Sequence, residues 1–295
     1  MGVRELDVAE ITAAVRDLCI TANYDLPVDV YEALKAAQEV EESPVGREVL
    51  AQLVENADIA AADRVPICQD TGLAVIFAEV GQDVHLTGGD FEEAVHEGVR
   101  RGYGEGYLRK SVAEEPAHAR RNTTDNTPAI IHTSIVPGDR LRLTMMAKGG
   151  GAENMSSLNM LKPAQGWAGV ADAVVGTVSR AGSNPCPPVV VGVGIGGTIE
   201  VVTLLAKKAL LREVGSRHPD PRLAVLEDEL LERINALGIG PQGLGGRTTA
   251  LAVFIEELSL IHISEPTRLL SISSAVFCLN KKNVLSLTRQ LFVPC

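Results

Sequence analysis

Apolar residues recur at helical spacing through the first sixty positions of the chain. Pro27 interrupts the pattern, and two further apolar stripes, over residues 30–37 and 49–54, indicate two more helices. The first stripe consists of Val8, Ile11, Val15, Leu18 and Cys19. Because Cys19 lies on this stripe, we expect it to be a core cysteine that packs as a small apolar side chain.

From residue 73 onward the pattern mixes strand-like and helix-like segments. Asp90, with Glu93 three residues later, predicts the start of a helix with a capping box. Residues 129–136 and 140–147 flank Pro137-Gly138-Asp139 and predict a β-hairpin. Further strands are expected at 73–80, 187–194 and 249–256, and helices at 171–178, 198–214 and 223–237. The order is not a regular βαβ alternation, so the expected fold class is α+β.

Charge and hydropathy exclude two broad classes of partner. The 38 acidic residues outnumber the 27 Lys and Arg residues, which gives a formal net charge of −11. A phosphate backbone requires a basic protein surface, so we expect no nucleic-acid partner. No apolar run would span a bilayer and the N-terminus lacks a signal-peptide pattern, so we expect a cytoplasmic protein without membrane contact.

The C-terminal segment has the sequence of a translated sequencing adapter. Residues 258–268 read LSLIHISEPTR, the translation of a transposase adapter, and ISSAVFCL at 272–279 is close to a second fixed stretch of the same DNA. We therefore predict a C-terminally truncated domain at residues 1–257 and a non-native tail at residues 258–295. Cys278 and Cys295 lie in this tail, so we expect neither to be functional.

The glycines at residues 192–197 match a pattern that is typical of dinucleotide-binding enzymes. They satisfy G-x-G-x-x-G between a predicted strand and a predicted helix, with Glu213 downstream, as in NAD-binding dehydrogenases. The alternative is a set of glycines that lets a helix pack closely on a strand. The preceding segment GSNPCPP suits a ligand loop better than a dinucleotide-binding strand, which disfavours NAD binding.

Three other polar or glycine-rich segments leave their roles open. KGGGAENMSS at 148–157 and GIGPQGLGGRTT at 238–249 have backbone N–H groups that could approach a small anion. For the first of these segments the alternative is a tight loop without a ligand. RRNTTDNTPA at 120–129 is dense in turn-forming residues and could be only a solvated loop.

Two cysteines outside the tail lie in loops rather than on apolar faces. Cys68 belongs to VPICQDTG at 65–72, and Cys186 lies between prolines in GSNPCPP at 182–188. They form no C-x-x-C pair, which argues against structural zinc. Thiolates from distant loops often hold an iron–sulfur cluster, and two inert thiols are the alternative.

Six motifs occur in the order found in the iron–sulfur hydro-lyases, and the chain resembles class I fumarate hydratase and L-tartrate dehydratase. The motifs are VPICQDTG, GYGEGYLRKS, RRNTTDNTPA, KGGGAENMS, GSNPCPPVVVGVGIGG and GIGPQGLGGRTTALAV. The resemblance covers essentially all of residues 1–257. It implies the α domain of such an enzyme, as the α subunit of a two-subunit form that pairs with a separate β subunit in a heterotetramer.

The resemblance implies a [4Fe–4S] cluster held by three cysteines, with one open iron that acts as a Lewis acid. Cys68 and Cys186 match two of these metal ligands. The third cysteine of the family pattern, and a histidine before it, would lie beyond the point where the tail begins, so the third ligand is missing. We therefore expect the chain as written to be inactive.

The remaining site residues are also implied by the resemblance. Asp70 matches the catalytic residue that exchanges a proton with the departing or attacking oxygen. Gln69, Arg109 and Gly151 match substrate-binding positions, and a guanidinium at Arg109 suits a carboxylate. The implied reaction is the reversible hydration of fumarate to (S)-malate. L-Tartrate dehydration is the alternative within the class, and NAD-dependent dehydrogenation the alternative outside it.

Overall fold

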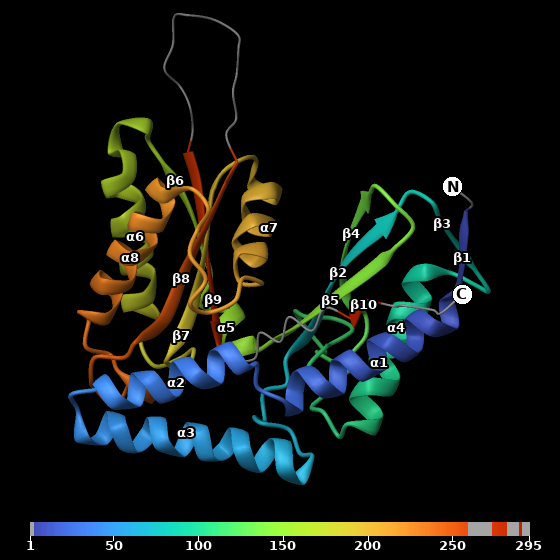
Figure 1. Cartoon of the computed structure of the whole chain (residues 1–295), viewed down its shortest axis with the longest axis horizontal. Helices are drawn as coiled ribbons and strands as arrows, with labels where there is room; N and C mark the ends of the chain where they lie inside the picture. The colour runs from blue at the N-terminus through green and yellow to red at the C-terminus, as the bar shows by residue number, and fades with distance from the viewer. Residues whose placement is uncertain (1–2, 259–272, 282–288, 291–295) are drawn as a thin grey trace, which may run out of the picture. The chain divides into compact units, whose positions relative to one another are not determined.

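A computed structural model of the chain describes residues 3–258, 273–281 and 289–290 (Figure 1). The chain divides into two compact units. Unit 1 takes its described residues from 1–27, 56–150 and 283–295, and unit 2 from 28–55 and 151–282. Helices combine with mixed sheets, which confirms the α+β class. Among the described helices, none has the length and apolar character needed to cross a bilayer.

Unit 1 is built on a four-stranded sheet in the order β10-β5-β2-β4, beside a parallel pair formed by β1 and β3. Its elements are β1 (Arg4–Asp7), α1 (Val8–Tyr24), β2 (Leu73–Gly81), β3 (Val84–Thr87), α4 (Phe91–Glu105), β4 (Ile130–Val136), β5 (Leu141–Lys148) and β10 (Arg289–Gln290). Asp90 caps α4 as predicted, since its Oδ1 accepts a 2.9 Å hydrogen bond from Glu93 N–H.

The predicted hairpin between residues 129–136 and 140–147 is wrong. Both segments are strands, but β2 lies between them, parallel to β4 and antiparallel to β5. The burial of the strands explains the order. β2 is apolar and almost wholly buried, which suits a central strand, whereas several side chains of β4 are exposed, as at a sheet edge.

Helices α1 and α4 supply the core of unit 1 together with one face of its sheet. The apolar stripe of α1, including Ile11, Val15 and Cys19, is buried against this core. Alternate residues of β5, such as Met145 and Ala147, belong to the same core. Because side chains alternate across a strand, the neighbouring residue Lys148 lies on the opposite face of the sheet.

Unit 2 contains a second four-stranded sheet, in the order β6-β9-β7-β8. Its elements are α2 (Val28–Val40), the first part of α3 (Pro44–Asp63), α5 (Gly150–Glu153), β6 (Ser157–Leu161), η1 (Pro163–Gln165), α6 (Gly166–Ala181), β7 (Val189–Gly196), α7 (Ile199–Ala209), α8 (Pro221–Asn235), η2 (Pro241–Gly243), β8 (Ala250–Leu258) and β9 (Ser273–Lys281). Helices α6 and α8 cover one face of the sheet and α7 covers the other (Figure 1). Val191, Val193 and Ile255 lie in the core on the α6–α8 side.

Part of the predicted tail forms strands in the structure. β9 runs antiparallel to both β6 and β7, and β10 pairs with β5. Strand pairing does not reveal the origin of a sequence, so a boundary between native chain and tail near residue 258 stays a prediction. Leu258 is the last residue of β8, and the remaining tail residues lie outside the described part of the chain.

Candidate active site

The turn that carries Cys68 and Asp70 lies between α3 and β2 in unit 1. The Asp70 backbone N–H donates to Cys68 Sγ across 3.4 Å, and the Cys68 thiol lies 3.2 Å from Gln69 Oε1. Cys68 and Asp70 are half-buried, and Gln69 is exposed. An N–H group directed at sulfur stabilises a thiolate, so the turn suits Cys68 as a metal ligand.

Close backbone packing fixes the end of this turn. Gly72 has φ +66°, and a Cβ atom there would lie 2.3 Å from the Lys148 backbone carbonyl. The Tyr103 hydroxyl donates to the carbonyl oxygens of Thr71 and Gly72, at 3.0 and 3.1 Å. Burial raises the pKa of Tyr103 well above its usual value, so its hydroxyl remains a donor. The backbone just after Asp70 is therefore held from two sides.

The glycine segment after β5 passes directly beside Asp70. A Cβ atom on Gly149 would lie 3.1 Å from Asp70 Oδ2, so only glycine lets the backbone come this close to the carboxylate without displacing it. Lys148, the last residue of β5, is fully buried next to this contact. The structure thus joins the VPICQDTG motif in unit 1 to Lys148 and Gly149, the first two residues of the KGGG motif.

Arg109 is tied to the same turn through its backbone. The Thr71 hydroxyl donates to the Arg109 carbonyl across 3.2 Å, and the preceding residue, Leu108, is buried. The Arg109 side chain is exposed. Unit 1 therefore brings together four of the predicted site residues, Cys68, Gln69, Asp70 and Arg109.

The other two predicted site residues meet in unit 2. Cys186 is half-buried and has φ +54°, a conformation that is uncommon for residues other than glycine. Its backbone N–H donates to Ser183 O across 2.9 Å. A Cβ atom on Gly151 would lie 3.1 Å from Asn184 O, which places Gly151 beside the Cys186 loop. That this pair meets the Cys68 turn remains a prediction, because the two belong to different units.

Two cysteines among the described residues are suitable ligands for an iron–sulfur cluster, but the third ligand is not among these residues. Cys68 and Cys186 are half-buried thiols in tight loops, as cluster ligands require. Within the described residues, no three His, Cys, Asp or Glu side chains form a metal site. Cys19 is fully buried in the core as predicted, and burial raises the pKa of its thiol, so it stays protonated there.

The second glycine-rich loop binds an anion of the protein itself. The Glu41 carboxylate accepts hydrogen bonds from the backbone N–H groups of Arg247 at 2.8 Å, Thr248 at 2.7 Å and Ser43 at 3.0 Å. Burial raises the pKa of Glu41, but these hydrogen bonds outweigh it and lower the pKa to about 2. The loop was expected to bind an external anion, but its Arg247 and Thr248 N–H groups donate to Glu41 instead. The role of Glu41 was not predicted from the sequence.

Replacing Glu41 by glutamine should destabilise unit 2 by about 2–3 kcal/mol at pH 7, because an amide NH₂ would face backbone donors. The folded-state pKa lies below the unfolded value. The stabilisation by the wild-type carboxylate is therefore complete above about pH 4.5 and is lost as the pH falls toward 2. Urea unfolding at pH 7 and pH 3 should show a difference between wild type and variant that shrinks at pH 3.

Glu42 provides the control for this prediction. It is exposed and bonds to the Arg247 side chain at 2.9 Å, and such surface pairs contribute little to stability. Glu42→Gln should therefore change the free energy of unfolding by less than about 1 kcal/mol. Equal effects of the two substitutions would show that the Glu41 contacts are not stabilising.

The G-x-G-x-x-G pattern is used for packing between a helix and a strand. Gly192 and Gly194 lie inside β7, where Cβ atoms would come within 2.2 Å of Ala206 O and 2.3 Å of Val202 O in α7. In a dinucleotide site these glycines form the turn after the strand and approach the pyrophosphate. The geometry therefore favours close packing over NAD binding.

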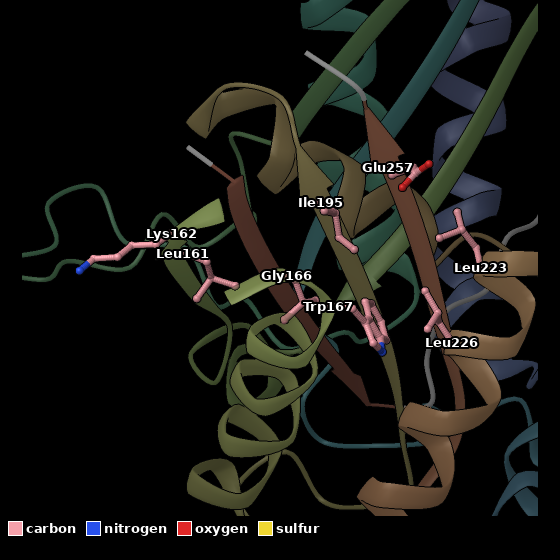
Figure 2. Close-up of a pocket in the computed structure, with 9 residues that line it drawn as sticks. Leu161, Lys162, Gly166, Trp167, Ile195, Leu223, Leu226 and Glu257 are labelled. Atoms are coloured by element: carbon pink, nitrogen blue, oxygen red, sulfur yellow. The ribbon is translucent and has the colours of Figure 1, made fainter. Parts of the chain in front are cut away.

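Two hollows in unit 2 have linings that do not suit a dicarboxylate. One, of about 200 Å³, is mainly apolar and is lined by Leu161, Trp167, Val170, Ile195, Leu223 and Leu226. Figure 2 shows the Lys162 amine pointing away from it. The other, of about 850 Å³, is lined by the carboxylates of Glu42, Asp228 and Glu232, and its Arg247 already pairs with Glu42. None of the predicted site residues lines either hollow.

Comparison with known proteins identifies the family of the chain. Residues 12–282 match the family described as fumarate hydratase (Fumerase). The chain belongs to the fumarate hydratase family. The family that was predicted from six ordered motifs is thus confirmed. The match ends at residue 282, inside the predicted tail.

Curated relatives of this chain bear the name of a subunit. A Methanocaldococcus jannaschii protein named "Putative L(+)-tartrate dehydratase subunit alpha" is 43% identical over 251 residues, 84% of this chain and 88% of the relative. The Escherichia coli K12 protein named L(+)-tartrate dehydratase subunit alpha is 33% identical over 251 residues, 84% of this chain and 82% of the relative. A Shigella sonnei protein with that name has the same identity and coverage.

Proposed function

We propose that the chain is the α subunit of an iron–sulfur hydro-lyase that adds water to fumarate, or removes it from (S)-malate, together with a β subunit in a heterotetramer. The observation that carries this proposal is the Cys68–Asp70 turn, where a backbone N–H points to the thiol and a carboxylate follows two residues later. The family membership and the subunit names of the relatives support the reaction class and the β partner. Thiol ligands of this kind suit a reducing cytoplasm.

In this proposal Cys68 and Cys186 hold the [4Fe–4S] cluster, with a third ligand that the native C-terminal sequence would provide. When bound, the cluster supplies an open iron that acts as a Lewis acid on the substrate hydroxyl and carboxylate. The enzyme needs no electron transfer for this role.

The protein's own groups then bind the substrate and move a proton. Asp70 gives a proton to the departing hydroxyl or takes one from the attacking water, and a base of the proposed β subunit takes or returns the proton of the adjacent C–H bond. Arg109 binds a substrate carboxylate, and its positive charge offsets the acidic character of the chain near a dianionic ligand. Gln69 donates a hydrogen bond to the substrate from its exposed amide. Gly151, without a side chain, lets the backbone approach the substrate.

The identity of the dicarboxylate has a second candidate. The relatives at 43% and 33% identity are named for L-tartrate, whereas the family is described by fumarate. Both substrates carry two carboxylates and lose or gain water at adjacent carbons, so the residues described here suit either. L-Tartrate dehydration is therefore the second proposed activity.

An anaerobic assay tests the function. A version of the chain with a family-like C-terminus should be reconstituted with iron and sulfide and combined with a β subunit. We expect a cluster absorption and turnover of either (S)-malate or L-tartrate, and the ratio of the two rates identifies the substrate. The chain as written should give no comparable rate, because we propose that its tail replaces the third ligand. Thermal stabilisation by NAD, without iron and without hydro-lyase turnover, would contradict the proposal.

A further inference from the structure

Asn126 is a fully buried amide in the RRNTTDNTPA segment, for which the sequence left open a solvated loop. Its φ of +64° lies in the left-handed region, where asparagine is tolerated better than most residues. Both ends of the amide are used in hydrogen bonds within unit 1. A buried side chain with both groups paired fixes the segments it contacts.

The Asn126 amide connects the two segments that carry Asp70 and Arg109. Its Oδ1 accepts a 2.6 Å hydrogen bond from the Ser111 backbone N–H, two residues after Arg109. Its Nδ2 donates across 3.2 Å to the Gly72 carbonyl, two residues after Asp70. The 3.2 Å bond from the Thr71 hydroxyl to the Arg109 carbonyl runs between the same two segments. Asn126 thus joins them from a third segment.

The backbone around Asn126 is itself anchored to α4. The Asp125 carboxylate accepts hydrogen bonds from the Thr127 N–H at 3.0 Å and the Thr127 hydroxyl at 2.8 Å. Arg100 of α4 donates to the same carboxylate across 3.1 Å. The amide is therefore held in place before it meets either loop, which is the condition for positioning other groups.

We propose that Asn126 is a positioning residue that sets the Arg109 segment against the Asp70 turn, so that the guanidinium and the carboxylate face one substrate. The catalytic part of this role rests on the proposed function, whereas the coupling of the two segments stands on the hydrogen bonds alone. One planar amide supplies both the acceptor for Ser111 and the donor for Gly72. An ionised carboxylate has no donor, and an apolar side chain has neither group.

Alkylation of individual cysteines tests the coupling in the full chain. In Asn126→Ala we expect Cys68 to react with iodoacetamide about five- to tenfold faster, the scale of one lost hydrogen bond. Cys186 in unit 2 and the fully buried Cys19 should keep their wild-type rates, as read for each peptide by mass spectrometry. An unchanged Cys68 rate, or a parallel rise at all three cysteines, would overturn the proposal, because a parallel rise reports general loosening.

Asn122→Ala is the matched control. Asn122 lies in the same segment, donates to the Lys110 carbonyl across 2.9 Å and accepts from the Thr124 N–H across 2.7 Å, but it is exposed and neither bond reaches the Asp70 turn. We expect its Cys68 alkylation rate to stay within about twofold of wild type. A rise as large as that in Asn126→Ala would show that any change in this segment loosens the turn, and would overturn the specific role of Asn126.

Asn126→Asp separates the two contacts. At pH 8 the carboxylate can still accept from Ser111 N–H but cannot donate to the Gly72 carbonyl. Hydrogen exchange should then accelerate in residues 67–72 while the Ser111 amide stays protected. Protection at wild-type level in both places would contradict the proposal.

In the reconstituted complex with β subunit, the kcat of Asn126→Asp should fall about tenfold with the cluster absorption retained. If wild type itself shows no turnover, the proposed function fails, and the alkylation rates still decide the coupling.

Discussion

Replacing Asp70 by asparagine should leave the cluster absorption intact and lower turnover by about a hundredfold or more in the reconstituted complex with a β subunit. Asparagine keeps the size of the side chain beside Gly149 but cannot exchange a proton near neutral pH. Its backbone N–H still reaches Cys68 Sγ, so the thiol environment should persist. Steady-state rates with (S)-malate and L-tartrate, read beside the absorption spectrum of the same sample, measure both effects.

Asp63 offers the matched control for this substitution. It is an exposed aspartate at the end of α3, in the same unit as Asp70. Asp63→Asn removes the same negative charge and should leave kcat within about twofold of wild type. Near-normal activity in Asp70→Asn would instead mean that this carboxylate is structural and that the turn matters through Cys68 alone.

Replacing either Cys68 or Cys186 by serine should abolish the iron–sulfur absorption in a chain with a native-like C-terminus. Two of the three thiolate anchors are expected here, and a serine hydroxyl is a far weaker ligand for iron than a thiolate. Absorption spectra and iron content after anaerobic reconstitution measure the loss. Normal iron content in either variant would remove that cysteine from the ligand set.

Cys19 separates loss of a ligand from loss of fold. It is fully buried in α1 against α4, and its pKa is raised by burial. Cys19→Ala should keep the cluster absorption while costing about 1 kcal/mol of stability through the small cavity it leaves. If Cys19→Ala also lost the absorption, the effects of the serine variants could not be assigned to missing ligands.

Local signals in the sequence predicted the elements better than their pairing. The Asp90 cap and the α1 stripe depend on residues within a few positions, and both are as expected. The position of β2 between β4 and β5 depends on which strand is the most apolar and therefore best suited to the centre of the sheet. That comparison involves segments that lie far apart in the sequence. The turn Pro137-Gly138-Asp139 shows that the chain reverses between two strands. It does not show that these strands are hydrogen-bonded neighbours in the sheet.

The site was predictable to the extent that short motifs carry it. Cys68 and Asp70 share one turn, so their proximity follows from the sequence. Glu41 and Asn126 were missed because their partners lie 206 and 54 residues away. The glycine-rich loop at 238–249 did indicate that its backbone N–H groups would bind an anion. The sequence did not show that the anion would come from the same chain.

The contact between β7 and α7 has a consequence for how this chain can vary. Cβ atoms at Gly192 and Gly194 would meet carbonyl oxygens of α7 rather than side chains. A clash with a side chain can be relieved by a smaller residue at a second site, but every residue retains its carbonyl oxygen. No single compensating substitution in α7 can therefore restore the contact, and natural variation in this helix should leave both glycines fixed.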